Sequence, residues 1–306
     1  MPKKTVFITG GSGFIGKNLV ESLRNTMTVY APSHADLDLL SQEAVSGFFR
    51  EHDIDYVIHC ANIGGNRKCP GPADSVGRNT RIFFNLIENS RSYEKLIHLG
   101  SGAEYDKSRP LSRIREDALG ERIPQDDYGF SKYLISKYIA KTENCVCLRL
   151  FGVFGKYEDY EYKFISNALL KNLLLMPISI RQNVLFDWLY IDDLTKIISC
   201  FLGRDVHYPD YNVTTGQPID LISLSTMIND GSPFKSKITI ENPGMNHEYC
   251  GNNERMFSEI GSFHFTPIFD ALSALRSYYT TILPQIDTDR IRCDEFARYC
   301  TIRTDT

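Results

Sequence analysis

The feature that most constrains the fold of this chain is a glycine-rich turn close to its N-terminus. The turn follows a short apolar run, Val6–Ile8, and opens a segment with helical periodicity, Phe14–Leu23. Glycines spaced as Gly-x-Gly-x-x-Gly permit a tight turn, a close approach of the backbone to a diphosphate, and close packing of the helix on the strand. Amides at the start of the helix would face that diphosphate. The pattern therefore predicts a dinucleotide-binding turn, formed by Gly10, Gly11, Ser12, Gly13, Phe14, Ile15 and Gly16.

Short apolar runs rich in β-branched residues alternate with helical patterns through the first half of the chain. The runs are Val6–Ile8, Thr28–Tyr30, Tyr56–Cys60, Leu96–Leu99 and Cys145–Leu150. The helical segments are Phe14–Leu23, Gln42–Glu51, Asn79–Glu88 and Lys132–Lys141. Each helical segment is long enough to cross back over a sheet. The alternation predicts an α/β fold with a Rossmann-type, doubly wound parallel sheet.

The alternation decays after about residue 155, which suggests two domains. We expect residues 1–155 to form a dinucleotide-binding domain, to which residues 184–213 return. Residues 156–183 and 214–306 would form a smaller, mixed α/β substrate-binding domain. The last stretch, residues 284–306, mixes charges of both signs and is interpreted as a solvated terminal helix or tail.

Charge and cysteine usage exclude several classes of function. The 306 residues include 38 acidic and 34 basic side chains without a basic run, so no nucleic-acid partner is expected. No apolar stretch approaches the ~20 residues that span a bilayer, and no signal-peptide-like region precedes the first strand. We therefore expect no membrane partner and a cytoplasmic location. The eight cysteines form no Cys-x-x-Cys pair, and no metal site is expected.

The residues after the second and third strands bear on the choice of nicotinamide cofactor. Ser33 and His34 stand where an acidic residue would hold the ribose hydroxyls of NAD. A hydroxyl and an imidazole can bind a 2′-phosphate, so NADP(H) is favoured, while NAD(H) stays possible because no arginine is present there. We expect Asp38 and Leu39 near the adenine. Residues that follow the third strand complete the predicted cofactor site: Cys60, Ala61 and Asn62.

A second motif, Tyr128-x-x-x-Lys132, puts a phenol and an ammonium on one face of a helix. Together with the glycine-rich turn and Ser101, it resembles the extended short-chain dehydrogenase/reductase family of nucleotide-sugar epimerases, dehydratases and reductases. The resemblance continues in Tyr190-Ile191-Asp192-Asp193 and in the Asn-Val-x-x-Gly turn of residues 211–216. Within the family the chain is most similar to the GDP-L-fucose synthases. That closer likeness lies in residues 35–40, 63–65, 72–74 and 99–101.

The three residues Ser101, Tyr128 and Lys132 form the expected catalytic set. A ketone accepts hydride only if its oxygen is protonated or tightly hydrogen-bonded, and Tyr128 would be that acid. An ammonium ~5 Å away contributes about 3 kcal/mol at an effective dielectric constant of ~20, so Lys132 would lower the pKa of Tyr128 by roughly two units. The resemblance implies that Lys132 also holds the nicotinamide ribose. Ser101 would donate to the same carbonyl oxygen.

Residues missing from the family pattern narrow the reaction. Family dehydratases carry two acidic residues where this chain has Gly102 and Ala103, which argues against 4,6-dehydration. Glu104 follows directly and is interpreted mainly as a salt-bridge residue, with substrate contact as the alternative. GDP-L-fucose synthases epimerise with a cysteine and a histidine, which align here with Ala103 and Lys163. The epimerising pair is therefore missing, although Lys163 could act as an acid or pair with substrate phosphate.

The arginine that often grips the substrate diphosphate in the family aligns with Phe186. Arg181 and Arg255 are candidates to replace it, since a guanidinium binds phosphate with two hydrogen bonds. Surface positions without a ligand are the alternative for both. The predicted substrate residues are thus Ala103, Glu104, Lys163, Arg181 and Arg255.

These observations predict an NADPH-dependent reductase for the C4 ketone of a nucleotide-linked sugar, expected to be a 6-deoxy sugar, without an epimerisation step. Two alternatives stay open. One is a C4 epimerase or dehydrogenase of nucleotide sugars with tightly bound NAD, and the other is a non-enzymatic, dinucleotide-sensing scaffold. The resemblance also implies a homodimer formed through the helix that carries Tyr-x-x-x-Lys and its neighbour.

Overall fold

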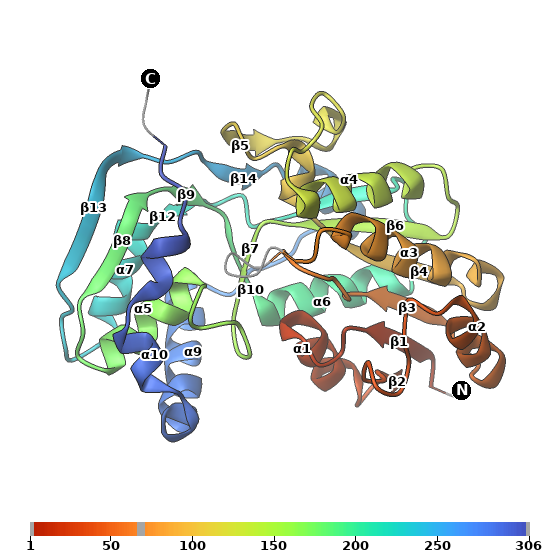
Figure 1. Cartoon of the computed structure of the whole chain (residues 1–306), viewed down its shortest axis with the longest axis horizontal. Helices are drawn as coiled ribbons and strands as arrows, with labels where there is room; N and C mark the ends of the chain where they lie inside the picture. The colour runs from red at the N-terminus through yellow and green to blue at the C-terminus, as the bar shows by residue number, and fades with distance from the viewer. Residues whose placement is uncertain (1–2, 66–70, 304–306) are drawn as a thin grey trace.

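The computed structural model describes residues 3–65 and 71–303. Its main sheet has six parallel strands in the order β11-β6-β4-β3-β1-β2 (Figure 1). The strands are β1 Thr5–Thr9, β2 Thr28–Tyr30, β3 Tyr56–His59, β4 Lys95–Ser101, β6 Cys145–Leu150 and β11 Asp210–Val213. The predicted α/β fold with a parallel sheet is confirmed.

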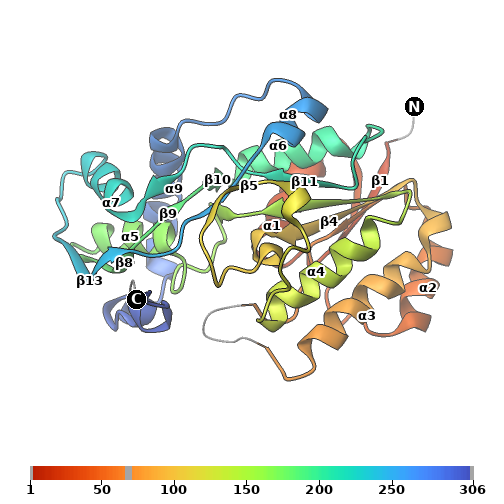
Figure 2. The same ribbon diagram turned by 90° about the horizontal axis from the view of Figure 1, so that it is seen from above.

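Both faces of this sheet are covered by helices (Figure 2). Val6 and Ile8 of β1 pack on the face covered by α1 and α6, whereas Phe7 between them packs on the face covered by α2, α3 and α4. A sheet buried on both faces needs apolar side chains at consecutive positions, which explains the continuous apolar runs in the sequence. The helices are α1 Phe14–Leu23, α2 Gln42–Glu51, α3 Ser75–Ile87, α4 Asp127–Ile139 and α6 Ile191–Leu202.

The strand order reverses direction beside β1, because β2 pairs with one edge of β1 and β3 with the other. In a doubly wound sheet, the crevice beyond the carboxyl ends of two such strands is where ligands bind. Here that crevice lies between the turn after β1 and the residues after β3. β4 ends on the far side of β3 at Ser101.

A smaller group of elements surrounds a second core at the other end of the molecule (Figure 1). In it, β8 pairs with β13 in parallel, and the buried residues Ile180, Leu170, Leu224 and Leu275 pack together. The elements are α5 Phe164–Leu173, β8 Ile178–Asn183, α7 Leu221–Asp230, β13 Ile238–Met245, α9 Ile268–Ile282 and α10 Thr288–Arg292. The division into two domains near residue 155 stays a prediction.

Short strands lie between these two groups (Figure 1). Four of them form a sheet in the order β12-β9-β14-β5, in which Tyr249 is the register partner of both Leu111 and Phe186. This sheet carries Tyr249 to the end of β4. The remaining elements are β5 Leu111–Ile114, β7 Gly152–Phe154, β9 Leu185–Phe186, β10 Trp188–Tyr190, β12 Ile219–Asp220, β14 Tyr249–Gly251 and α8 Glu254–Ile260.

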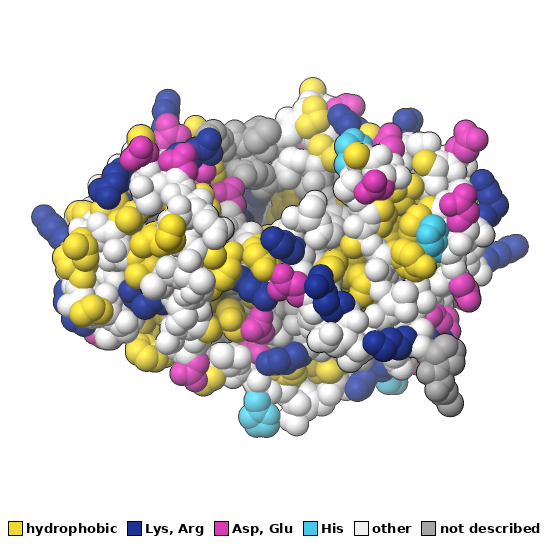
Figure 3. Space-filling view, turned by 90° about the horizontal axis from the view of Figure 1, so that it is seen from below, with side chains coloured by type: hydrophobic (Ala, Val, Ile, Leu, Met, Phe, Trp, Pro, Cys, Tyr) yellow, Lys and Arg dark blue, Asp and Glu magenta, His cyan; other side chains and the backbone are white. Residues whose placement is uncertain are grey.

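The C-terminal stretch is not the solvated tail that its charges suggested. Ile286 and Ile291 are buried in the second core, and the 3₁₀ turn Glu295–Tyr299 packs beside β8. Charged side chains of both signs are interspersed on the face shown in Figure 3. Among the described helices, none is long and apolar enough to cross a membrane.

Candidate active site

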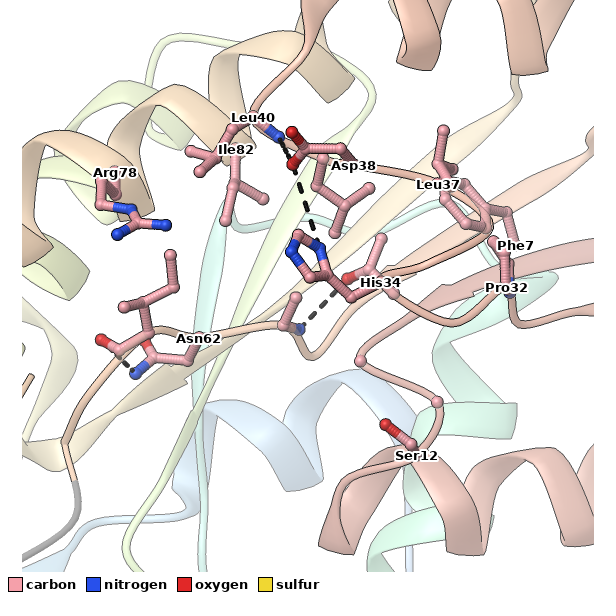
Figure 4. Close-up of a pocket in the computed structure, with 16 residues that line it drawn as sticks. Phe7, Ser12, Pro32, His34, Leu37, Asp38, Leu40, Asn62, Arg78 and Ile82 are labelled. Carbon is pink, nitrogen blue, oxygen red and sulfur yellow. Dashed lines mark hydrogen bonds and ion pairs between the residues drawn. The ribbon is translucent and has the colours of Figure 1, made fainter. Parts of the chain in front are cut away.

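A cavity of about 260 Å³ opens at the carboxyl ends of β1 and β3 (Figure 4). It lies at the crevice where the strand order reverses, and it is lined by residues from the turns that follow β1, β2 and β3. Eight of the predicted cofactor residues line it: Gly10, Gly11, Ser12, His34, Asp38, Leu39, Ala61 and Asn62.

The glycine-rich turn has the backbone geometry that its spacing predicted. Gly10 has a φ of +67°, and a methyl group there would lie 2.9 Å from the backbone of Ala61. A methyl group on Gly16 would overlap the carbonyl oxygen of Gly10, so the glycine permits the close packing of helix on strand. α1 begins at Phe14, and its N-cap Gly13 provides no side-chain hydrogen bond. The first amides of α1, including that of Ile15, can therefore bind an anion, and the turn fits a dinucleotide diphosphate.

Eight of the predicted cofactor residues do not line this cavity: Gly13, Phe14, Ile15, Gly16, Ser33, Cys60, Tyr128 and Lys132. The Ser33 hydroxyl donates to the carboxylate of Asp36 at 2.6 Å, which closes the local turn and removes it from the cavity. Cys60 lies beneath the cavity, where burial raises the pKa of its thiol to about 12. The imidazole of His34 does reach the cavity and lies 4.0 Å from the carboxylate of Asp38.

Sequence reasoning missed Arg78, which α3 brings to the cavity. Figure 4 shows its guanidinium projecting into the cavity that His34 also lines. The Nε of Arg78 is buried and has no hydrogen-bond partner among the described residues. A buried guanidinium nitrogen without a hydrogen-bond partner costs free energy, so Arg78 is suited to bind an anionic ligand. No local pattern could have revealed it, since one helix, α2, and one strand, β3, lie in the sequence between the residues after β2 and α3, the helix that carries Arg78.

The predicted catalytic residues meet at the end of β4. Ser101 is the last residue of β4, Tyr128 lies in the first turn of α4, and Lys132 follows one turn later. The Ser101 hydroxyl lies close enough to the phenol of Tyr128 to lower the pKa of that phenol. The ammonium of Lys132 donates to the carbonyl oxygen of Leu99 at 2.7 Å. The tertiary structure thus brings together the three residues that the two motifs proposed.

The electrostatics of this group differ from the sequence-based expectation. Burial raises the pKa of Tyr128, and the group that lowers it is the Ser101 hydroxyl, not Lys132. Burial also lowers the pKa of Lys132, whose ammonium is directed at Leu99. Lys132 therefore does not lower the pKa of Tyr128 as the sequence had led us to expect. A raised pKa keeps the phenol protonated at neutral pH, as a proton donor must be.

A second phenol, which sequence reasoning missed, also reaches the catalytic serine. The hydroxyl of Tyr249 lies 3.4 Å from the Oγ of Ser101. A methyl group on Gly102 would lie 2.6 Å from the ring of Phe151 and 2.8 Å from the Tyr249 oxygen. Aromatic side chains therefore fill the space beside Gly102, the first of the two positions at which family dehydratases carry an acid. Sequence analysis did not identify Tyr249, because its position beside Ser101 depends on the pairing of β14 with β5 and β9.

Glu104 forms a salt bridge, the role that the sequence favoured for it, and its inclusion among the substrate residues is corrected. Its side chain is fully buried and accepts from Arg149 Nε at 2.5 Å, from the Ser136 hydroxyl at 2.6 Å and from the Ser101 amide at 2.8 Å. It therefore fixes the end of β4 to α4 and β6. Ala103 is buried as well and does not line a cavity.

Arg255 also lies away from the cavities, which corrects its assignment as a diphosphate ligand. Its guanidinium pairs with Asp210 at 2.5 Å and with Glu116 at 3.8 Å, and two carboxylates leave it no role toward an anion.

A second cavity, of about 380 Å³, lies between the catalytic group and the second core. We call it the substrate cavity. Tyr249 joins it to the catalytic serine, and the ammonium of Lys107, also in its wall, is 5.8 Å from the ring centre of Tyr128. Of the predicted substrate residues, Lys163 and Arg181 line it. The lining also includes aromatic and basic residues, among them Arg109, Phe151, Tyr162, Phe186, Trp188, Tyr299 and Arg303.

Glu158 is an ionisable group of the substrate cavity that sequence reasoning missed. Burial raises the pKa of its carboxyl to about 7, while the charge of Lys163 and a hydrogen bond from Ser166 at 2.5 Å act in the opposite direction. At neutral pH this carboxyl can therefore either hold or release a proton.

A doubly wound sheet with this turn, and with serine, tyrosine and lysine at the end of β4, defines a dinucleotide-dependent enzyme of the short-chain dehydrogenase/reductase class. Residues 6–214 match the NAD dependent epimerase/dehydratase family, and the chain belongs to this family. In the described residues, no group of three histidine, cysteine or acidic side chains could hold a metal ion.

Similar proteins agree with this class. The chain is 26% identical to GDP-L-fucose synthase 1 of Arabidopsis thaliana, over 76% of this chain and 79% of that protein. It is 28% identical to dTDP-4-dehydro-6-deoxyglucose reductase of Escherichia coli, over 79% of this chain and 86% of that protein. Its fold matches a GDP-mannoheptose C4 reductase from Campylobacter jejuni with a TM-score of 0.79, at 18% identity, over 92% and 99% of the two chains.

Proposed function

We propose that this protein reduces the C4 ketone of a nucleotide-linked sugar, expected to be a 6-deoxy sugar, with NADPH. The observation that carries the proposal is the meeting of Ser101, Tyr128 and Lys132 at the end of β4. The aromatic neighbours of Gly102 leave no room there for a dehydratase acid. The names of the similar proteins support the substrate class, since they act on GDP- or dTDP-linked sugars.

In this mechanism the reduced nicotinamide supplies the hydride, and the side chains handle the oxygen. The phenol of Tyr128 donates its proton to the carbonyl oxygen as negative charge develops there. The Ser101 hydroxyl stabilises the same oxygen by a hydrogen bond. Its position is held by the Glu104 carboxylate on the Ser101 amide and by the Tyr249 hydroxyl. Lys132, whose ammonium donates to the carbonyl oxygen of Leu99, would hold the nicotinamide ribose, as the family resemblance implies.

The preference for NADPH rests on the cavity beyond the glycine-rich turn. Arg78 and His34 line it, and Arg78 has a buried nitrogen without a partner among the described residues. A 2′-phosphate supplies the anion that such a guanidinium requires. The similar reductase from Campylobacter jejuni is described with NADP bound, which supports the same choice.

The test is a panel of GDP-, CDP-, dTDP- and UDP-linked 4-keto-6-deoxysugars, each mixed with the protein and NADPH. We expect at least one of them to oxidise NADPH, with an alcohol at C4 of the product. Tyr128→Phe should abolish turnover and leave NADPH affinity unchanged. The proposal fails if folded protein oxidises NADPH with none of the sugars, or if Tyr128→Phe retains wild-type turnover.

Glu158 supports a second candidate function, in which epimerisation precedes reduction. An acid with a pKa of about 7 in the substrate cavity, beside Lys163, could remove and return a proton on a carbon next to the ketone. Incubating a 4-keto sugar with the protein in D₂O without NADPH distinguishes the two reactions. If the sugar takes up deuterium with wild-type protein but not with Glu158→Gln, epimerisation is favoured. If the sugar takes up no deuterium, reduction without epimerisation is favoured.

Release of tightly held NAD from the purified protein would instead favour the C4 epimerase or dehydrogenase among the alternatives. An empty site that binds NADPH favours the reductase.

A further inference from the structure

The C-terminal segment of the chain, residues 294–303, forms one wall of the substrate cavity. Tyr299, Cys300, Thr301 and Arg303 all line it. The ring of Tyr299 packs edge-on against Tyr162, with 5.5 Å between the ring centres. The segment is therefore part of the site that would hold the substrate, although the charges of this part of the chain suggested an exposed tail.

Contacts at both ends hold this segment in place. At its start, Asp294 pairs with the buried ammonium of Lys171 and accepts from the Ser179 hydroxyl at 2.7 Å. At its end, the Gln182 side chain accepts from the amide of Arg303 at 2.9 Å and donates to the carbonyl oxygen of Arg303 at 2.6 Å. The Gln182 side chain thus accepts one hydrogen bond from the Arg303 backbone and donates another to it. Together the two bonds fix the position of this backbone, because both geometries must be satisfied at once.

A third contact lies between these ends. The Asn246 side chain donates to the carbonyl oxygen of Thr301 at 2.7 Å. Asn246 lines the cavity itself, so the segment is bound to the opposite edge of the same opening. The segment is thus ordered before any substrate arrives, which lowers the entropy cost of binding.

The Gln182 side chain holds the backbone of Arg303 against β8, the strand that also carries Arg181. Both arginines line the substrate cavity. The Nε of Arg181 is buried without a hydrogen-bond partner among the described residues, although its Nη1 pairs with Glu241 at 2.6 Å. The described residues therefore do not satisfy the Arg181 side chain fully, which points to an anionic ligand.

The charge inside the substrate cavity points the same way. Five basic and two acidic residues line it: Lys107, Arg109, Lys163, Arg181, Arg303, Glu158 and Glu248. The Nε of Arg109 is also buried without a described partner. Glu121 pairs with Arg109 and Glu241 with Arg181, and the positive charge that is left favours an anionic ligand.

We infer that residues 294–303 are a built part of the nucleotide-sugar site, and that Arg303 and Arg181 bind the substrate diphosphate. This inference rests on the proposed function, because the diphosphate belongs to that substrate. The two guanidinium groups take the place of an arginine at position 186, where Phe186 instead stacks on Tyr249 with 5.3 Å between ring centres. Guanidinium groups suit this role since each can form two parallel hydrogen bonds to phosphate oxygens.

The test is calorimetric titration of the full chain with GDP, CDP, dTDP and UDP. Arg303→Ala should lower the affinity for the tightest-binding of these ligands by about tenfold or more, because a charge-assisted hydrogen bond is lost. The same substitution should lower the affinity for the matching nucleoside monophosphate less, since the lost contact is to the diphosphate. The matched control is Arg298→Ala, which removes an exposed arginine of the same segment, 3.9 Å from Glu295. NADPH affinity should be unchanged in both variants.

Gln182→Leu provides a second variant, because it releases the backbone of Arg303 without removing a charge. It should weaken diphosphate binding in the same direction as Arg303→Ala. Equal diphosphate affinity in wild type and Arg303→Ala would overturn the inference and leave the proposed function standing. Equal losses in Arg298→Ala and Arg303→Ala would also overturn it. If wild-type protein binds none of the four diphosphates, the inference and the proposed function both fail.

Discussion

Replacing Glu104 with glutamine should destabilise the fold and misplace the catalytic serine. One carboxylate oxygen accepts from Arg149 and Ser136, and the other accepts from the Ser101 amide. A glutamine amide has only one acceptor oxygen, so its NH₂ group must face one of these donors. The Glu104 and Arg149 side chains are fully buried, and breaking such a pair costs 3–5 kcal/mol in general. In the variant, Arg149 still pairs with Asp210 at 2.7 Å. We therefore expect the free energy of unfolding to fall by about 3 kcal/mol, the lower end of this range.

Urea denaturation of wild type and Glu104→Gln measures this loss directly. The control is Glu254→Gln, which removes an exposed ion pair with Arg115 at 2.7 Å and should leave the unfolding midpoint unchanged. A loss below about 1 kcal/mol for Glu104→Gln would refute the buried-pair reasoning. The double variant Glu104→Leu, Arg149→Met should recover much of the stability, since no unpaired charge is then left in the interior.

Three further predictions address the cofactor, the packing at the catalytic serine and the pH dependence of stability. Arg78→Ala should raise the KM for NADPH about tenfold and leave the KM for NADH unchanged, whereas Arg81→Ala on the same helix should change neither. Gly102→Ala should lower turnover more than NADPH binding, because its methyl group would lie 2.6 Å from the Phe151 ring. Glu158 favours its protonated form in the folded state, so stability should fall by about 3 kcal/mol as pH rises from 4.5 to above 7. Thermal unfolding of Glu158→Gln across this range should lack that fall, and a parallel decline in both proteins would contradict the assignment.

Prediction from sequence succeeded where the informative residues are neighbours along the chain. The glycine-rich turn specifies its own geometry, because a left-handed φ at Gly10 and the tight contact at Gly16 are local requirements. Tyr128 and Lys132 lie one helical turn apart whatever surrounds them. The apolar runs predicted the strands of the main sheet for the same reason, since a strand buried on both faces needs consecutive apolar residues.

Prediction from sequence failed where a role depends on which distant segment lies alongside. The salt bridge of Glu104 was expected, but its partner Arg149 was not, because only the pairing of β4 with β6 sets Arg149 beside it. Arg255 looked like a free cation until folding placed Asp210 and Glu116 against it. Burial and pairing are properties of the assembled structure, and they reverse what a charged residue can do.

The sequence by itself determined the class of this protein, because the dinucleotide turn and the Tyr-x-x-x-Lys motif, whose tyrosine and lysine we propose to be catalytic, are encoded by short spacings. The tertiary structure alone decided how the substrate cavity is built. It brought Tyr249 to Ser101 through a strand pairing, Arg78 to the cofactor cavity through a helix, and Arg303 to β8 through the Gln182 side chain. Such contacts join residues far apart in the chain, and the free energy that selects them comes from the packing of the whole fold.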